Sequence, residues 1–247
     1  MIRGAGTLPA LLFLFSSVAA AQDERVVTSP DGQIEFRISL AQPQPGDLFH
    51  LAYQVFFRAK PLLDTSFFGL EVHNQEPILG ANLGLTNFRE SKTGPYHSLL
   101  AEYEQNGSLG RRLNLEVRVY NAGVAFRYVI PKSTPLEDFL LEDEATEFSF
   151  AVEPAIHSAN LSLPLTCEVP GVGFVAITEA PAKSYPPMHL IRTNPKTLIT
   201  RLARLAGQPD LAVDAKTPIT SSWRVLLIGT SAAHLLDSKL VDGLTSD

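Results

Sequence analysis

The densest group of chemically capable side chains in this sequence is a run of carboxylates between residues 137 and 147. Its members are Glu137, Asp138, Glu142, Asp143, Glu144 and Glu147. Carboxylate oxygens are the ligands that calcium prefers, but a calcium-binding loop alternates its acidic residues and places a glycine at its sharp turn. This run has neither feature, so the sequence predicts a solvated acidic face here.

Histidine and cysteine add little further chemistry. The six histidines show no HxH or HExxH spacing, so neither a metal site nor the histidine–glutamate pair that a sugar mutarotase needs can be assigned. Cys167 is the single cysteine, which leaves no intramolecular disulfide. Because no histidine or lysine adjoins it, we expect a small apolar strand residue rather than a nucleophile.

The N-terminus has the pattern of an export signal. Arg3 precedes a short apolar run broken by two serines, and three alanines follow at 19–21. The run is shorter than the roughly 20 residues that a membrane-spanning helix needs, and this order of features is typical of a secretory signal peptide. We expect cleavage near Ala21 and residence in the bacterial periplasm or outside the cell, with residues 22–247 as one mature domain.

Alternating apolar residues elsewhere predict an antiparallel β-sandwich. From Gln33 to Leu40 every second residue is apolar, and residues 117–131 predict a hairpin around the turn Asn121-Ala122-Gly123. Further runs with strand character lie at 48–57, 67–72, 112–120, 147–152, 163–169, 174–178 and 224–228. Helical spacing of apolar residues at 231–241 predicts one short C-terminal helix. The net charge of −6 argues against nucleic acid as a partner.

Several blocks of the chain resemble, in order, the N-terminal β-sandwich domain of glycoside hydrolase family 97, which comprises calcium-dependent α-glucosidases and α-galactosidases. The blocks are SPDGQIEFRISL (29–40), GLEV (69–72), LGLTNF (83–88), YNAGVAFRY (120–128), PLTCEVPGVGFVAITEA (164–180), SYPPMHL (184–190), TSSWRVLLIG (220–229) and LLDSKLVDGL (235–244). Each block alone is weakly specific, but their shared order across nearly the whole mature chain makes the resemblance specific.

The resemblance implies an all-β antiparallel supersandwich of the galactose-mutarotase type. In the family, this domain packs on a (β/α)8 barrel that carries the catalytic carboxylates and most of the calcium ligands. Such a barrel needs about 250 residues, and too few follow Trp223 to form one. We therefore expect no catalytic residue in this chain and no cleavage of a glycosidic bond by it alone, because hydrolysis needs two carboxylates that flank the bond.

The resemblance also implies that this domain supplies one glutamate to the calcium site of the family. The best matched residue is Glu179 in the AITEA block, and Glu168 in PLTCE is the alternative. Calcium collects six to eight oxygen ligands, which one glutamate cannot supply. We therefore expect calcium to bind only together with a partner barrel.

Three functions remain open at this point. The first is a non-catalytic, carbohydrate-associated domain that binds an α-glucoside or α-galactoside, or packs on a (β/α)8 catalytic domain encoded on another chain. The second is a truncated fragment of a calcium-dependent α-glucosidase or α-galactosidase. The third is a mutarotase-like enzyme, which rests on fold analogy alone. The sequence favours the first, with an apolar surface expected where a barrel would pack.

Overall fold

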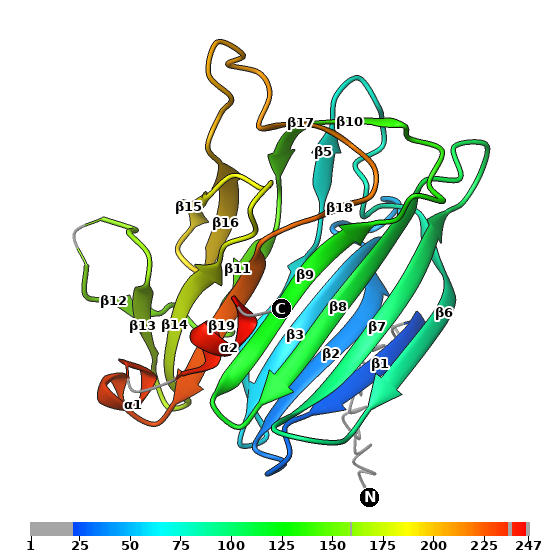
Figure 1. Ribbon diagram of the computed structural model, residues 1–247. Coiled ribbons are helices and arrows are strands. Elements are labelled where there is room, and N and C mark those ends of the chain that lie inside the picture. Colours follow the sequence, from blue (N-terminus) through cyan, green and yellow to red (C-terminus); the bar gives the residue numbers. More distant parts are fainter. Residues whose placement is uncertain (1–21, 159, 237–238, 246–247) are drawn as a thin grey trace, which may run out of the picture.

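A computed structural model describes residues 22–158, 160–236 and 239–245 as a β-protein (Figure 1). Every pairing between its named strands is antiparallel. The predicted all-β antiparallel sandwich is confirmed. The predicted signal peptide at residues 1–21 lies outside the described residues.

The largest sheet has nine strands and forms the front of the molecule in Figure 1. Its order is β12-β13-β14-β19-β9-β8-β7-β6, with β18 paired beside β9. The strands are β6 (Leu83–Ser91), β7 (Tyr96–Gln105), β8 (Arg112–Tyr120), β9 (Gly123–Ile130), β12 (Ala155–Ile156), β13 (Leu165–Val169), β14 (Gly173–Ala180), β18 (Ile219–Thr220) and β19 (Trp223–Gly229). Strand β19, the last in the described chain, lies between β9 and β14 and so joins the two halves of the sheet.

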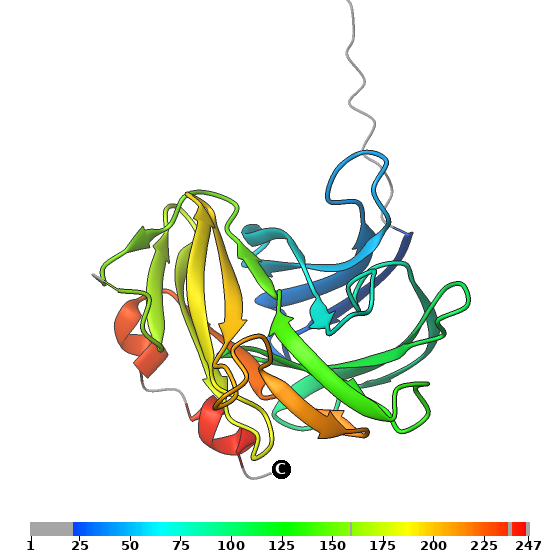
Figure 2. The same cartoon turned by 90° about the horizontal axis from the view of Figure 1, so that it is seen from above.

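Three smaller groups of strands complete the sandwich, as the view from above shows (Figure 2). A four-stranded meander lies behind the large sheet: β1 (Gln22–Thr28), β2 (Ile34–Ala41), β3 (His50–Phe57) and β4 (Lys60–Phe67). A second group has the order β17-β10-β5: Val213–Lys216, Asp138–Glu144 and Leu70–Val72. The third has the order β11-β16-β15: Glu147–Ser149, Thr197–Leu202 and Met188–Asn194.

Alternate side chains of the strands point inward and form the core, as predicted. In β2, Ile34, Phe36 and Ile38 are fully buried, while the residues between them are half-buried. The ring of Phe36 stacks on Tyr53 with 5.2 Å between centroids and lies 6.0 Å from Phe126 on the opposite sheet. This aromatic contact ties the meander to the large sheet, because buried aromatic rings bring both area and ring–ring attraction.

The hairpin of β8 and β9 is confirmed, with one difference at its turn. Gly123 pairs with Tyr120 as the first residue of β9, so only two residues connect the strands. Gly123 has a φ of +154°, and a Cβ there would lie 2.1 Å from the carbonyl oxygen of Leu226 on β19. Glycine is therefore required at this position by the close approach of β19 as well as by the backbone.

Some strands differ from the sequence prediction. The predicted strand 147–152 is only the three-residue β11, whereas 48–57 and 163–169 are confirmed with starts at His50 and Leu165. The strands that were not predicted include β1, β4, β6, β7, β10, β15, β16 and β17. Edge strand β6 shows the reason, because most of its residues are exposed and need no apolar partner.

The C-terminal helix predicted at 231–241 consists of two short helices, α1 (Ala232–Leu236) and α2 (Leu240–Leu244), which cover the outer face of β14 and β19. Leu235, Leu240 and Leu244 pack there in one apolar cluster with Trp223, which is 2% exposed and therefore core, as predicted. Among the described residues, no helix has the length and apolarity needed to cross a bilayer.

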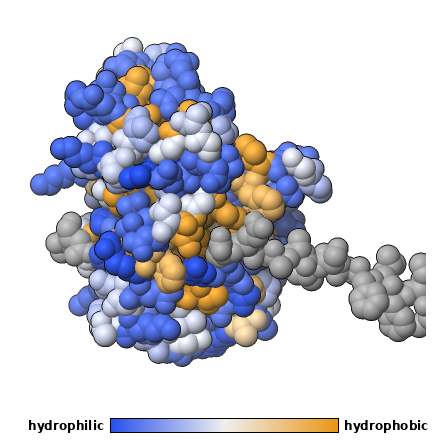
Figure 3. All heavy atoms as spheres, turned by 90° about the vertical axis from the view of Figure 1, so that its right-hand side faces the viewer, coloured by the Kyte–Doolittle hydropathy of each residue, from blue (hydrophilic) through white to orange (hydrophobic). Residues whose placement is uncertain are grey.

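Exposed apolar side chains are scattered over the described surface. They are Val26, Leu48, Phe49, Phe88, Leu109, Val152 and Ile191. On the side that carries the edges β1 and β6, Figure 3 shows apolar groups interspersed with polar ones. Arg25 lies over the Phe88 ring there, 4.4 Å from its centroid. These residues do not identify one docking face.

Candidate functional site

A buried ion pair between Arg224 of β19 and Glu144 of β10 forms the centre of the candidate site. Both side chains have no exposed surface. Arg224 donates from Nε to Oε1 of Glu144 at 2.8 Å and from Nη2 to Oε2 at 2.6 Å. This bidentate geometry is the strongest that arginine and a carboxylate form, and it fixes the orientation of both groups.

The strand pattern explains why Arg224 points inward. In β19, Leu226 and Ile228 belong to the main core, whereas Trp223 and Val225 belong to the cluster on the outer face. Arg224 is in phase with the inner set, because alternate residues of a strand share a face. A buried guanidinium needs a carboxylate partner, and Glu144 meets that need from the opposing strand.

Two further groups saturate the Glu144 carboxylate. Its Oε1 accepts from the Thr146 hydroxyl at 2.7 Å, and its Oε2 accepts from the Tyr185 hydroxyl at 3.0 Å. Tyr128 lies 2.6 Å from the Thr146 hydroxyl and extends the network. Burial, together with the Glu144 charge, raises the pKa of both tyrosines well above the usual value, so they stay neutral donors.

Glu179 is the point at which this network reaches the surface. It lies opposite Arg224 in the register of β14 and β19, and its Oε2 accepts from Arg224 Nη1 at 2.8 Å. The backbone N–H of Met188 lies 3.3 Å from Oε1 and 3.2 Å from Oε2. The Glu179 side chain is 14% exposed, whereas Arg224 is fully buried. The site thus presents one oriented carboxylate at the protein surface.

Burial and nearby charges shift the pKa values of Glu179 and Arg224 in opposite directions. Burial raises the pKa of Glu179, and the nearby Arg224 and the Met188 N–H oppose that rise. Burial by itself would lower the pKa of Arg224, but Glu144, with smaller contributions from Tyr185 and Glu179, outweighs burial and raises this pKa, so the guanidinium stays charged. Together Arg224, Glu144 and Glu179 carry one surplus negative charge when both carboxylates are ionised.

The acidic run 137–147 is not the solvated face that the sequence predicted. Glu137 and Asp138 are exposed, but Asp143 is 2% exposed and Glu144 is fully buried. Asp143 pairs with Arg204 at 2.8 Å, and its Oδ1 accepts from the backbone N–H of Leu202 at 2.8 Å. The prediction was wrong for these two residues because Arg204 and Arg224, with which they form ion pairs, lie much later in the chain.

Glu168, the alternative calcium ligand, lies apart from Glu179. It pairs with Phe174 at the start of β14, whereas Glu179 lies near the end of that strand. Its neighbours Cys167 and Val169 point into the core, so alternation directs Glu168 to the other face. Its side chain is 45% exposed and faces His157 at 3.8 Å. The structure does not bring the two glutamates together.

Glu179 fits one position of a calcium shell, because calcium takes carboxylate oxygens. The described residues do not provide the rest of a shell, since no group of three or more histidine, cysteine, aspartate or glutamate side chains converges among them. Cys167 is also unsuited to metal or nucleophilic chemistry. It is fully buried, and burial raises the pKa of its thiol to about 12.

The structure reveals a histidine–glutamate pair that could not be assigned from sequence. His73 Nδ1 lies 2.7 Å from Glu142 Oε1, and His73 Nε2 lies 2.8 Å from Asn74 Nδ2. Glu142 and Asn74 line an adjacent hollow of about 440 Å³, together with Glu71, Val72, Gln75, Glu76 and Ile78. Such a pair can transfer protons if a substrate enters within hydrogen-bonding reach.

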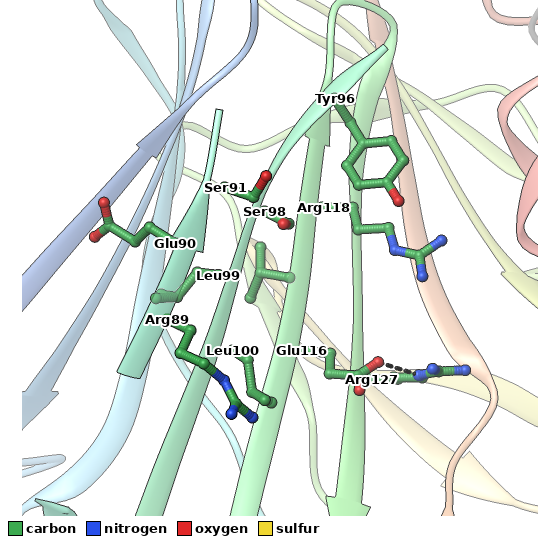
Figure 4. A pocket seen from close by; sticks show the side chains of 11 residues that line it. Arg89, Glu90, Ser91, Tyr96, Ser98, Leu99, Leu100, Glu116, Arg118 and Arg127 are labelled. Carbon is green, nitrogen blue, oxygen red and sulfur yellow. Dashed lines mark hydrogen bonds and ion pairs between the residues drawn. The ribbon is translucent and has the colours of Figure 1, made fainter. Parts of the chain in front are cut away.

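A second hollow, of about 280 Å³, lies on the outer face of β6 to β9 (Figure 4). There Arg127 Nε donates to Glu116 at 2.6 Å, and Tyr96 lies beside Arg118. The guanidinium groups of Arg118 and Arg127 lie 4.7 Å and 4.3 Å from the ring centroid of Trp223. The hollow is open and polar, and Arg224 and Glu179 lie on the opposite face of the large sheet.

Comparison with known proteins decides the family. The sequence profile described as glycosyl-hydrolase 97 N-terminal matches residues 27–162 and 152–246. The chain belongs to this family. Among curated proteins, none matches.

Solved structures share the fold of this family-97 domain. A glycoside hydrolase family 97 enzyme from Pseudoalteromonas sp. strain K8, in complex with acarbose, matches with a TM-score of 0.77 and 20% identity. That match covers 89% of this chain and 38% of the enzyme. A β-arabinopyranosidase matches with a TM-score of 0.69 and 19% identity over 85% of this chain and 40% of that one. The domain therefore corresponds to well under half of either enzyme.

Proposed function

We propose that this family-97 N-terminal domain is a non-catalytic part of a glycoside hydrolase and works against a (β/α)8 catalytic domain, on its own polypeptide or on another. The observation that carries the proposal is the oriented carboxylate of Glu179 at the surface end of a buried network. Among the described residues no cluster of metal-ligating side chains surrounds this fixed, partly exposed carboxylate, so it is suited to complete a site whose other groups come from elsewhere.

In this proposal, Glu179 is one ligand of a calcium ion shared with the catalytic domain. A carboxylate offers about four acceptor positions. Oε2 of Glu179 uses two of them for Arg224 and Met188 and Oε1 uses one for Met188, so one position on Oε1 remains for a cation. Bound calcium would supply a positive charge that polarises groups of the carbohydrate substrate. Glu168 is the less suitable candidate, because it projects from the outer face of β13 and is paired only with exposed His157.

An α-glucoside or α-galactoside is the expected ligand of the assembled protein, and the chain is expected to be exported through its N-terminal signal. The match to only 38% of the Pseudoalteromonas enzyme supports a role as one part of a larger assembly. Neither nucleic acid nor a membrane is expected as a partner.

Calcium-dependent hydrolysis tests the proposal. The purified chain alone should not hydrolyse nitrophenyl α-glucoside or α-galactoside. Activity should appear when the chain is combined with a family-97 (β/α)8 catalytic domain. Glu179→Gln should then raise the calcium concentration needed for activity, whereas Glu168→Gln should not. Hydrolysis by the chain alone, or identical calcium dependence of wild type and Glu179→Gln, would refute the proposal. Calorimetric titration with maltose and an α-galactoside checks direct sugar binding.

A mutarotase-like activity is the second candidate, favoured by the half-exposed pair of His73 and Glu142 beside a hollow. Polarimetry on freshly dissolved α-glucose or α-galactose tests it. Faster mutarotation by the chain, lost in Glu142→Gln, would support this activity, and an unchanged rate would exclude it for these sugars.

A further inference from the structure

We propose that the outer face of strands β6 to β9 binds a neutral oligosaccharide, at a site separate from Glu179. The site is a polar trough formed by two neighbouring hollows, the one of about 280 Å³ described above and one of about 420 Å³. This binding site goes beyond the proposed function of Glu179 and takes from it only the choice of α-linked sugars as probes.

The side chains of the trough follow from the alternation of β7 and β8. In both strands one set of residues is buried in the core, and the other set faces outward. The outward set includes Glu102 and Glu104 on β7 and Asn114 and Glu116 on β8. A solvated sheet face is polar by default, so the arrangement of these side chains, rather than their polarity, indicates a ligand.

The charges of the trough are arranged in balanced pairs. Four arginines and four glutamates line the two hollows together. Because the charges cancel, an ion of either sign gains no net attraction, and a neutral ligand is favoured. Figure 4 shows part of this arrangement on neighbouring strands. The ion pairs within the trough, with their nitrogen–oxygen distances, are Arg89–Glu102 at 3.4 Å, Arg112–Glu104 at 3.0 Å and Arg127–Glu116 at 2.6 Å.

Two of these pairs place a donor and an acceptor side by side. Arg127 binds Oε2 of Glu116 through its Nε, and within the described chain its Nη atoms and Oε1 of Glu116 make no other hydrogen bond. Arg112 and Glu104 are joined in the same way, through Nε and Oε2. A hydroxyl both donates and accepts, so one sugar hydroxyl can bridge a guanidinium and the carboxylate beside it.

These groups are held in place before a ligand arrives. All four side chains of the two pairs project from hydrogen-bonded strands, and Arg112 lies directly opposite Glu104 and Arg127 directly opposite Glu116. The guanidinium of Arg127 also lies 4.3 Å from the ring centroid of Trp223, which restricts its movement. Binding to groups that are already ordered costs less conformational entropy than binding to mobile side chains.

The spacing of the two pairs sets the length of the ligand. Glu116 lies opposite Leu100, which is four residues from Glu104 along β7. At the usual rise per strand residue, the two pairs are therefore about 13 Å apart. A monosaccharide does not span this distance, whereas an oligosaccharide can contact both pairs at once. The affinity of the trough should therefore increase with the number of linked sugars.

Titration of the full chain, followed by amide NMR, tests the site. Maltoheptaose and verbascose are the neutral α-glucosyl and α-galactosyl probes, and glucose and galactose are their monosaccharide controls. At least one oligosaccharide should shift the amides around Leu100, Glu104 and Glu116, with a Kd at least roughly tenfold lower than that of its monosaccharide. An oligogalacturonate of similar length should bind no more tightly, because the charges of the trough cancel.

Charge-matched double variants test the two pairs separately. One combines Glu104→Ala with Arg112→Ala, and the other combines Glu116→Ala with Arg127→Met, which keeps an apolar side chain beside Trp223. Each variant removes one positive and one negative charge. Each should raise the Kd of the oligosaccharide roughly tenfold, since charge-assisted hydrogen bonds to the ligand are lost.

The control removes an ion pair outside the trough. Asp138→Ala combined with Lys216→Ala eliminates a pair at 3.5 Å whose side chains are 70% and 74% exposed. This variant should bind the oligosaccharide as the wild type does. It separates the loss of a particular pair from the general effect of removing two surface charges.

Three results would overturn the inference: no shift with either oligosaccharide, shifts confined to Met188 beside Glu179, or a Kd that both trough variants leave unchanged. Tighter binding of the oligogalacturonate would overturn the choice of a neutral ligand. The proposed function fails separately. Hydrolysis by the assembled enzyme that does not depend on calcium would refute the role of Glu179 and leave the oligosaccharide Kd of the trough as measured.

Discussion

Arg224 and Glu179 lie opposite each other on neighbouring strands, and Nη1 of the arginine donates to Oε2 of the glutamate at 2.8 Å. The arginine is completely buried and the glutamate is 14% exposed. The hydrogen-bonded chain therefore begins inside the sandwich at Glu144 and ends at the surface. Polar groups placed this deep are costly to a core unless each is satisfied, so the stability of the domain depends on the same residues as its candidate site.

Replacing Glu144 by leucine should destabilise the domain by about 3–5 kcal/mol, the usual cost of breaking a buried ion pair from one side. Arg224 loses its bidentate partner, and the hydroxyls of Tyr185 and Thr146 lose their acceptor. Urea unfolding followed by tryptophan fluorescence measures the change, since Trp223 is the single tryptophan.

The half-exposed pair of Glu116 and Arg127 provides the control for that experiment. Its atoms lie 2.6 Å apart, but its side chains are 29% and 21% exposed. Glu116→Gln should therefore cost less than about 1 kcal/mol. Adding Arg224→Met to Glu144→Leu should restore most of the lost stability. Equal losses at Glu116 and Glu144 would show that burial of the inner pair does not govern its contribution.

The sequence predicted the elements whose signal is local. Strict alternation in β2 and in the β8–β9 hairpin identified strands that are half-covered by one core. Strands β6 and β15 were missed because they lie at sheet edges, where most side chains face solvent and alternation disappears. Their pairing comes from backbone hydrogen bonds to neighbours that the sequence does not reveal.

The candidate site was predicted only at its exposed end. Glu179 was identified through resemblance, but Glu144 was assigned to a solvated run. A signal was present for Arg224, which is in phase with buried Leu226 and Ile228. In β10 the residue in phase with buried Phe139 and Leu141 is Asp143, which pairs with Arg204, whereas Glu144 is one position out of phase and had no such signal. Charged residues in phase with a core strand predict a buried pair. The identity of the partner depends on tertiary packing across 80 residues of sequence.

Glu147 makes stability depend on pH. Burial raises its pKa above the ordinary 4.5, although the backbone N–H of Phe67 partly opposes the rise. The folded state therefore holds its proton more tightly than the unfolded state. This favourable contribution is complete below pH 4.5 and is lost as pH rises through the folded pKa. Glu147→Gln should raise Tm relative to wild type at pH 7–8 and leave it nearly unchanged at pH 4.

Thermal unfolding between pH 4 and 8 checks this, with Glu137→Gln as the comparison because the Glu137 side chain is 90% exposed. Glutamine at position 147 can still accept the Phe67 N–H, which lies 3.3 Å from Oε2 of Glu147. The rise in Tm of Glu147→Gln at pH 7–8 should therefore reflect the removed charge alone. A gain at position 147 that is equally large at pH 4 would contradict the assigned cause.

Cys167 should be inert in the folded protein. It is fully buried, and its thiol pKa is raised to about 12, so almost no thiolate exists at neutral pH. A thiol reagent such as DTNB should modify it only after the chain unfolds, with the rate in urea following the unfolded fraction. Fast modification without denaturant would mean that β13 opens locally, since Cys167 lies in the middle of that strand.

Gly123, the single glycine of the β8–β9 hairpin, should not tolerate a side chain. A Cβ at this position would lie 2.1 Å from the carbonyl oxygen of Leu226, whose backbone pairs with β9 and cannot move alone. Gly123→Ala should cost roughly 3 kcal/mol through overpacking. Gly171 offers the matched control: its φ is +74°, and a Cβ there would meet nothing within 4 Å. Gly171→Ala should cost only the left-handed backbone penalty of about 1–2 kcal/mol. Urea unfolding of both variants checks the difference, and equal costs would show that β19 does not constrain the start of β9.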